Sequence, residues 1–243
     1  AFSPPTELTL TQRNAIDAIV NASITASKTP GCIISITGPE GYYSKAYGNT
    51  LGRPKRPLTT ADHFRMGSVT KTFTGTAFWL TLDKGLLSLD DTLETYVPGV
   101  PNGSSITMAH LLSMRSGVYD FTYNTGFLLK FITMPASPYS QEQCIDLIKS
   151  GAPQFAPGTA NKYVNSNAIL IAAVVEAATG RRLRDIFAED IWAPLGMTET
   201  AWPSIMTTPL PATGSAKLNP ELFGAAGCLT STVGDLTKWA VAL

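Results

Sequence analysis

The chain has 243 residues, of which 44% are hydrophobic and 15% are charged, and its 18 basic and 18 acidic side chains cancel to a net charge of zero. This balance, together with the lack of any basic run, removes the electrostatic case for nucleic acid as a partner. No apolar stretch approaches the roughly 20 residues that cross a bilayer, so we predict no membrane span. The length is enough for one large domain or two smaller ones with a substantial core.

The first 60 residues predict one helix followed by a β-hairpin. Apolar side chains recur at helical spacing between Thr11 and Ala26, which is typical of a packing face. Residues 31–37 are rich in isoleucine, residues 38–41 are a Gly-Pro-Glu-Gly turn, and residues 42–47 alternate well enough to form the returning strand. A two-stranded hairpin alone is only marginally stable, so we expect further strands to pair with it.

The next segment carries the main chemical signal of the chain. Ser68 and Lys71 are three residues apart and face the same side of a helix that starts at the serine. We expect this helix to reach Lys84 and to stop at Gly85. A serine becomes a nucleophile when a nearby base accepts its proton, and a lysine amine is such a base when burial lowers its pKa. The apolar neighbours expected to bury the pair are Phe64, Met66, Phe73, Phe78 and Trp79.

A structural interpretation of the same motif also has to be considered. A chain of this length contains about one Ser-x-x-Lys by chance, given ordinary residue frequencies. A serine at the start of a helix is also a common N-cap. The motif alone therefore favours the N-cap, and the rest of the chain has to decide between the two interpretations.

The remaining residues predict a mainly helical region. Residues 86–101 are turn-like, residues 116–121 form an aromatic loop, and Ser140 with Gln143 fits a capping box that opens a helix ending near Lys149. Other helices are expected at 106–114, 169–178, 184–191 and from about Thr232. This order predicts an α+β fold with three parts: residues 1–60 with the N-terminal helix and hairpin, a mainly helical subdomain at 61–222 that carries the nucleophile, and a return segment with the final helix at 223–243.

The cysteines and histidines do not form a recognisable metal motif. Cys32, Cys144 and Cys228 are far apart in sequence, and we expect free, buried thiols. His63 and His110 are outside any His-x-x-x-His or Cys-x-x-Cys frame, so we predict neither a metal nor another cofactor. The chain begins with Ala-Phe-Ser-Pro-Pro rather than methionine, which is typical of a processed N-terminus and predicts a secreted or cell-envelope protein.

Several blocks in the same order resemble one known superfamily, and this resemblance covers almost the whole chain. The Ser-x-x-Lys block is similar to the nucleophile motif of serine β-lactamases and penicillin-binding proteins. The match is with the class C β-lactamase-like branch, which includes D-alanyl-D-alanine carboxypeptidases and several esterases. The other matching blocks are residues 85–91, 106–113, Ser116-Gly117, Tyr163-Val164-Asn165, 194–197 and 226–231.

The resemblance implies a fold and a role for individual residues. It implies a β-lactamase/transpeptidase-like fold, with an antiparallel sheet flanked by helices and a mainly helical subdomain. Ser68 is expected to be acylated, Lys71 and Tyr163 to pass its proton to the leaving group, and Asn165 to bind a substrate amide. We also expect Phe127 at the substrate site. The structural alternative for Tyr163 is a core tyrosine with a satisfied hydroxyl.

One motif of the superfamily is not found where it is expected. A Lys or His, then Thr, Ser or Gly, then Gly lies on a later strand that also supplies an oxyanion donor. The only formal match here, Lys149-Ser150-Gly151, precedes Tyr163 and is predicted to be accidental. We therefore expect a fragment, completed by a C-terminal segment or a second chain that supplies the strands absent from this chain. The alternative is a shortened, inactive descendant.

The resulting functional prediction is a serine hydrolase with an acyl-enzyme intermediate at Ser68. The amino-acid sequence around Ser68 and at residues 116–121 resembles that of D-alanyl-D-alanine carboxypeptidases and D-amino-acid peptidases more than that of class C β-lactamases. The expected substrates are small peptides, β-lactams or esters. The alternatives are an esterase, transesterase or β-lactamase of the same fold, and a catalytically inactive module that binds peptidoglycan-like peptides.

Overall fold

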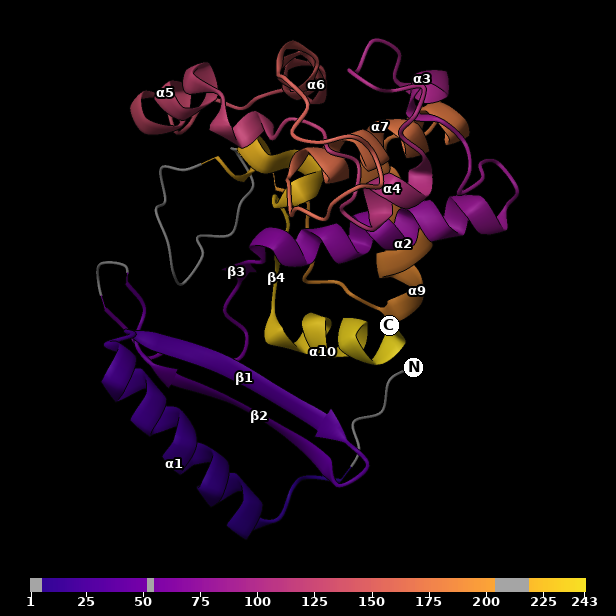
Figure 1. Cartoon of the computed structure of the whole chain (residues 1–243). Helices are drawn as coiled ribbons and strands as arrows, with labels where there is room; N and C mark the ends of the chain where they lie inside the picture. Colours follow the sequence, from indigo (N-terminus) through magenta and orange to yellow (C-terminus); the bar gives the residue numbers. More distant parts are fainter. Residues whose placement is uncertain (1–5, 52–54, 204–218) are drawn as a thin grey trace.

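The computed structural model describes residues 6–51, 55–203 and 219–243 of the chain. Figure 1 shows a hairpin unit at one side and a helical body at the other. The hairpin pairs β1 (Gly31–Gly38) with β2 (Gly41–Gly48) in antiparallel register, with Ile34 opposite Lys45. Helix α1 (Leu10–Ser27) lies along one face of this hairpin (Figure 1).

Contacts of Asp17 hold α1 on the hairpin. Its carboxylate accepts hydrogen bonds from the Tyr43 hydroxyl at 2.6 Å, the Tyr47 hydroxyl at 2.5 Å and the Lys45 amine at 2.5 Å. The three donors alternate along β2, so they point to the same face of the strand. This cluster attaches the helix to the sheet although α1 itself buries no residue.

Helix α10 (Val233–Ala242) connects the hairpin to the helical body, and Figure 1 shows it between the two. On the hairpin side, the Thr237 hydroxyl lies 2.7 Å from the Ser35 hydroxyl. On the other side, the Trp239 ring stacks on Phe73 with 4.0 Å between centroids, and its indole N–H donates to the Thr72 hydroxyl at 2.8 Å. The last described helix therefore fixes the position of the hairpin relative to the helix that follows Ser68.

The helical body is built around α2 (Thr70–Asp83) and α7 (Ser166–Thr179). Nine of the 14 residues of α7 are buried, as expected for a helix that is apolar on nearly all sides. The other helices and turns surround this pair (Figure 1). They are η1 (Gly67–Val69), α3 (Leu93–Tyr96), α4 (Met108–Leu112), η2 (Phe121–Tyr123), α5 (Thr125–Thr133), α6 (Gln141–Ser150), α8 (Leu183–Ile186), η3 (Phe187–Trp192), α9 (Ala193–Leu195) and η4 (Pro220–Ala226).

A second, very short sheet lies next to the Ser68 turn. Strand β3 (Phe64–Arg65) pairs with β4 (Thr230–Ser231) in antiparallel register. Beyond it, the Met66 N–H donates to the Leu229 carbonyl at 2.9 Å, and the Leu229 N–H donates to the Thr70 hydroxyl at 3.2 Å. The turn with Ser68 is thus fastened to a segment about 160 residues later in the chain.

Most of the predicted elements are confirmed. The first helix, the hairpin, the helix after Ser68 and the Ser140–Gln143 capping box are present near their expected bounds. Helix α5 was not predicted, since no element was assigned to residues 122–139, and the two-residue strands β3 and β4 are too short to show an alternating pattern. The three-part division of the chain and the pairing of further strands with the hairpin stay predictions.

Candidate active site

Ser68 lies in a single 3-10 turn that runs directly into α2. Gly67 begins this turn with a φ of 51°, a left-handed conformation that suits glycine. Ser68 is exposed, whereas Thr70, Phe73 and Thr74 in the following turn are buried. The side chain of Ser68 does not cap α2, because its hydroxyl makes the contacts described next. The N-cap interpretation of Ser68 is therefore wrong.

Lys71 and Tyr163 both reach the Ser68 hydroxyl. The Lys71 amine nitrogen lies 3.1 Å from Oγ, and the Tyr163 hydroxyl lies 2.7 Å from Oγ. The Tyr163 side chain comes from the segment just before α7 and is 54% exposed, so it is not a core tyrosine. The predicted convergence of the three side chains is confirmed.

The surroundings of Lys71 define how its amine can act. Nζ donates to the side-chain carbonyl of Asn165 at 2.9 Å and to the backbone carbonyl of Ala226 at 2.8 Å. It also lies 4.9 Å from the centroid of the Tyr163 ring. Two carbonyl oxygens can only accept, so they occupy two N–H groups of the amine. The remaining position on nitrogen faces the serine oxygen, where a neutral amine presents its lone pair and an ammonium presents a third N–H.

Asp120 holds the segment that carries Tyr163 and Asn165. This carboxylate is only 2% exposed, and it accepts from the Asn165 backbone N–H at 3.1 Å with one oxygen. Its other oxygen accepts from the Thr122 backbone N–H at 3.0 Å and the Thr122 hydroxyl at 2.8 Å. One buried side chain thereby joins the aromatic loop to the start of α7.

Two further hydrogen bonds fasten the same loop to α7. The Phe121 N–H donates to the Ser166 hydroxyl at 3.0 Å, and the Ser116 hydroxyl lies 2.6 Å from the side-chain carbonyl of Asn167. Sequence reasoning assigned no role to Asp120, Ser166 or Ala226. The only signal for Asp120 was an acidic residue between aromatic ones, and the Ala226 contact involves a backbone carbonyl that carries no sequence signal.

The burial expected around the site is only partly present. Met66, Phe73 and Phe78 are buried, but Trp79 is 48% exposed because it lies on the face of α2 away from the core. Ser68 and Tyr163 are exposed as well. The expectation that these apolar neighbours bury the Ser-Lys pair is therefore wrong for Ser68, and the site is open on one side.

Phe127 requires a correction. We expected it at the substrate site, but it is 2% exposed and belongs to the core. Its ring lies edge-on to Phe121 at 5.1 Å between centroids, beside Tyr139 at 5.2 Å and near Phe223 at 6.2 Å. Helix α5 is amphipathic with this residue on its inner face, so the side chain packs under the loop instead of facing a ligand.

The end of α6 contains Lys149 and Ser150, and Gly151 is its C-cap. This position at a helix end agrees with the prediction that the three residues match the later family motif by accident. A Cβ at Gly151 would overlap the Tyr119 ring, so this glycine is needed for packing.

Among the described residues, no cluster of three or more His, Cys, Asp or Glu side chains is placed to hold a metal ion. None of the helices in this part of the chain has both the length and the apolar character to cross a membrane. All three cysteines are free thiols, with Cys144 and Cys228 buried and Cys32 partly exposed.

Solved structures with a similar backbone identify the fold of this chain. The chain superposes on a D-stereospecific amidohydrolase from Streptomyces with a TM-score of 0.81 and 26% identity, covering 94% of this chain and 72% of that one. A D-amino acid amidase from Ochrobactrum anthropi gives a TM-score of 0.81 at 24% identity, covering 95% of this chain and 68% of that one. These structures confirm the predicted β-lactamase/transpeptidase-like fold.

Sequence comparison assigns the family. The family model described as Beta-lactamase matches residues 16–243, and the chain belongs to this family. It is 29% identical over 171 residues to penicillin-binding protein 4* of Bacillus subtilis, covering 70% of this chain and 37% of that protein. It is also 29% identical over 188 residues to a D-aminopeptidase of Cereibacter sphaeroides, covering 76% and 35%. The chain thus spans little more than a third of the length of these two relatives.

Proposed function

We propose that this chain carries the nucleophile-bearing part of a serine hydrolase that forms an acyl-enzyme at Ser68. The observation that carries the proposal is the convergence on one exposed hydroxyl of the Lys71 amine at 3.1 Å and the Tyr163 hydroxyl at 2.7 Å. Both distances are within the reach that a general base needs. A catalytically inactive binding module has no reason to keep all three groups in contact, so this geometry favours an enzyme.

The proposed reaction has two halves. In the first, the serine oxygen attacks the substrate carbonyl, and its proton passes to the lone pair of a neutral Lys71 amine or to the oxygen of an ionised Tyr163. The tetrahedral intermediate collapses when the bond to the leaving nitrogen or oxygen breaks, and Tyr163 returns the proton to that atom. In the second half, water attacks the ester at Ser68, and the same groups move the proton in reverse to release the acid and restore the hydroxyl.

The other contacts of the site prepare this proton transfer. Asn165 and Ala226 occupy two N–H groups of Lys71 and so orient the third position towards Ser68. The start of a helix follows the serine, and its dipole favours negative charge that develops on or beside Oγ. The backbone N–H of Ser68 is the proposed first oxyanion donor, by resemblance to the superfamily. Loss of one such donor typically raises the barrier by about 2.7–4 kcal/mol.

The proposed substrate is the amide of a D-amino acid, in a D-alanyl-D-alanine carboxypeptidase or a related D-amino-acid peptidase. Support comes from the relatives described as a D-aminopeptidase and a penicillin-binding protein, and from the amidohydrolase described as D-stereospecific. Small D-peptides and β-lactams are therefore the proposed ligands. Esters are the second choice within the same acyl-enzyme chemistry.

We propose that the natural protein lies outside the cytoplasm or in the cell envelope, and fractionation of cells followed by immunoblotting tests that location.

Covalent labelling tests the nucleophile. A fluorophosphonate ester, or penicillin, should add one phosphonyl or acyl group to the full-length protein, and peptide mapping should place it on Ser68. Ser68→Ala should abolish the adduct, whereas Ser104→Ala, a change of an exposed serine in a turn away from the site, should leave it unchanged. Labelling that persists in Ser68→Ala contradicts the assignment.

Substrate specificity is tested with paired compounds. D-alanyl-D-alanine peptides should be cleaved faster than their L,L counterparts, and penicillin adducts that last for hours favour a carboxypeptidase. Rapid turnover of penicillin indicates a β-lactamase instead. Turnover of simple esters without any cleavage of D-peptides favours the esterase alternative.

A further inference from the structure

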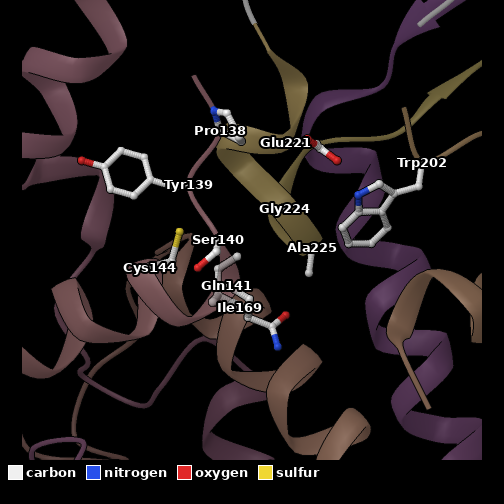
Figure 2. A pocket seen from close by; sticks show the side chains of 10 residues that line it. All are labelled: Pro138, Tyr139, Ser140, Gln141, Cys144, Ile169, Trp202, Glu221, Gly224 and Ala225. Carbon is white, nitrogen blue, oxygen red and sulfur yellow. The ribbon is translucent and has the colours of Figure 1, made fainter. Parts of the chain in front are cut away.

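A cavity of about 320 Å³ lies outside the Ser68 site and has no role in the reaction proposed above. Figure 2 shows Trp202 and Glu221 on one side of it and Ser140 and Cys144 on the other. None of Ser68, Lys71 or Tyr163 lines it. The volume lies at the lower end of the range of about 300–1,000 Å³ for small-molecule sites. The remaining lining residues are Pro138, Tyr139, Gln141, Ile169, Gly224 and Ala225.

The polar groups of the lining differ in whether they are already bonded. The Gln141 side-chain amide donates to Glu176 at 2.6 Å, and the Pro138 carbonyl accepts from Lys130 at 2.8 Å. The Ala225 carbonyl accepts from the Thr74 hydroxyl at 2.8 Å. Within the described part of the chain, the Glu221 carboxylate has neither an ion pair nor a side-chain hydrogen bond. It is also the only charged side chain among the described residues of the lining.

Two acceptors of this lining remain available within the described part of the chain. The Glu221 carboxylate carries a negative charge, and the side-chain oxygen of Gln141 remains available because only its NH₂ group is engaged. Trp202 adds an aromatic surface that attracts cations, and Ile169 and Ala225 add apolar area. On the Tyr139 side, the Lys130 amine donates to the Pro138 carbonyl and lies 4.0 Å from the centroid of the Tyr139 ring, so this cation is already engaged.

We propose that this cavity is a binding site for a small organic ammonium compound with an apolar body. The ammonium group pairs with Glu221, and the apolar body packs between Trp202 and Ile169. A neutral or anionic ligand of the same size lacks a partner for the carboxylate, which would then be desolvated without compensation. The ligand class thus follows from a carboxylate that has no ion pair among the described residues and from the apolar surface of Trp202, Ile169 and Ala225.

The cavity and the Ser68 site share one wall. Ala225 lines the cavity, and the next residue, Ala226, offers the carbonyl that accepts from the Lys71 amine at 2.8 Å. Both belong to η4, in which Gly224 has a non-helical φ of 41° and allows the kink. Because the two sites are adjacent but do not share a side chain, binding in the cavity is measurable in a protein that cannot react.

Benzylamine is a suitable probe, and its titration into the Ser68→Ala protein separates this proposal from the proposed reaction. We expect saturable, one-to-one binding by calorimetry and a change in tryptophan fluorescence. Glu221→Gln should weaken binding roughly tenfold or more, the effect expected for loss of one hydrogen bond to a charged group. Benzyl alcohol, which has the same shape without the charge, should bind more weakly by a similar factor. Trp202→Phe should remove the fluorescence change.

Matched variants exclude a general effect of charge or of tryptophan. Glu40→Gln changes an exposed residue of the hairpin turn, and Trp79→Phe changes an exposed tryptophan of α2. Both should bind benzylamine like the parent protein, and Trp79→Phe should keep the fluorescence change. Absence of saturable binding, or equal affinity in Glu221→Gln, overturns the proposal.

Cys144 offers a second, residue-specific measurement. It lines the cavity and is 1% exposed, and burial raises the pKa of its thiol to about 12, so methyl methanethiosulfonate should modify it slowly. At a benzylamine concentration of about ten times Kd, roughly a tenth of the sites stay free, and modification of Cys144 should slow about tenfold. Cys32, on the hairpin, should react at an unchanged rate. An unchanged rate at Cys144 would place the ligand elsewhere and refute the assignment.

Discussion

Replacing Asp120 by Asn should slow acylation of Ser68 although residue 120 does not touch the serine. In the wild-type chain both carboxylate oxygens accept, one from the Asn165 N–H at 3.1 Å and the other from Thr122 at 3.0 and 2.8 Å. An asparagine side chain has one oxygen and one NH₂ group. Whichever way the new amide is turned, one backbone N–H faces that NH₂ group and loses its acceptor.

The size of the effect follows from burial and charge. Asp120 is 2% exposed, so water does not replace the lost acceptor. A hydrogen bond to a charged group contributes about 1.5–3 kcal/mol. This hydrogen bond holds the segment that carries Tyr163 and Asn165, so its loss should raise the activation barrier of acylation by the same free energy. The acylation rate then falls roughly ten- to hundredfold, since each 1.36 kcal/mol is a factor of ten.

The assay is the rate at which a fluorophosphonate labels Ser68 in the full-length protein, measured together with the unfolding temperature. Asp90→Asn is the control, because Asp90 is exposed and its carboxylate is not needed by the site. A rate equal to that of the wild type, accompanied by a lower unfolding temperature, would show that Asp120 stabilises the fold without positioning Tyr163 and Asn165.

Four other changes have defined outcomes. Lys71→Arg should slow acylation nearly as much as Lys71→Ala, because a guanidinium keeps the charge but cannot give up a proton; a rate near that of the wild type would make the lysine a fixed charge only. Tyr163→Phe should lower the acylation rate about 10²–10⁴-fold, the usual contribution of a proton-transferring side chain, with little change in unfolding temperature because the ring is 54% exposed. Hydrogen bonds from Lys45, then Tyr43 and Tyr47, hold the pKa of Asp17 at about 2, below its ordinary value of 3.8. The ionised carboxylate therefore stabilises the folded chain above pH 4, and this stabilisation is lost as the pH falls from about 4 towards 2, so Asp17→Asn should flatten the plot of unfolding temperature against pH in that range. Phe127→Ala should lower the free energy of unfolding by about 3–5 kcal/mol in urea titrations, whereas Leu129→Ala, at 61% exposure on the same helix, should change it by about 0.5 kcal/mol or less.

The local parts of the structure were predictable because they depend on neighbours in sequence. Ser68 and Lys71 are three residues apart, and a single turn of backbone brings them to 3.1 Å. The same holds for the capping box of Ser140 and Gln143, whose two hydrogen bonds close within one turn. Tyr163 was found differently, through resemblance to a family, since its spacing from Ser68 carries no physical signal.

The predictions that were wrong concern side chains whose position is decided by tertiary packing. Phe127 was expected at the substrate site. Helix α5 turns this side chain inwards against Phe121, Tyr139 and Phe223, and burial of so large a ring favours the core over a solvated site. Trp79 was expected beside the Ser-Lys pair, but its place on α2 turns it towards solvent.

By itself the sequence determined that Ser68 and Lys71 lie on one side of a helix start, and it determined the hairpin and most helices, because these follow from periodicity, capping and turn residues over short stretches. Only the tertiary structure decided what completes the site. It brought the Tyr163 hydroxyl to within 2.7 Å of a serine 95 residues earlier, and the Ala226 carbonyl to a lysine 155 residues earlier. It also brought the buried Asp120 of the aromatic loop to the backbone N–H of Asn165, just before α7. Such contacts depend on how α2, α7 and η4 pack together, and the energy of that packing is summed over many apolar side chains that individually specify no particular partner.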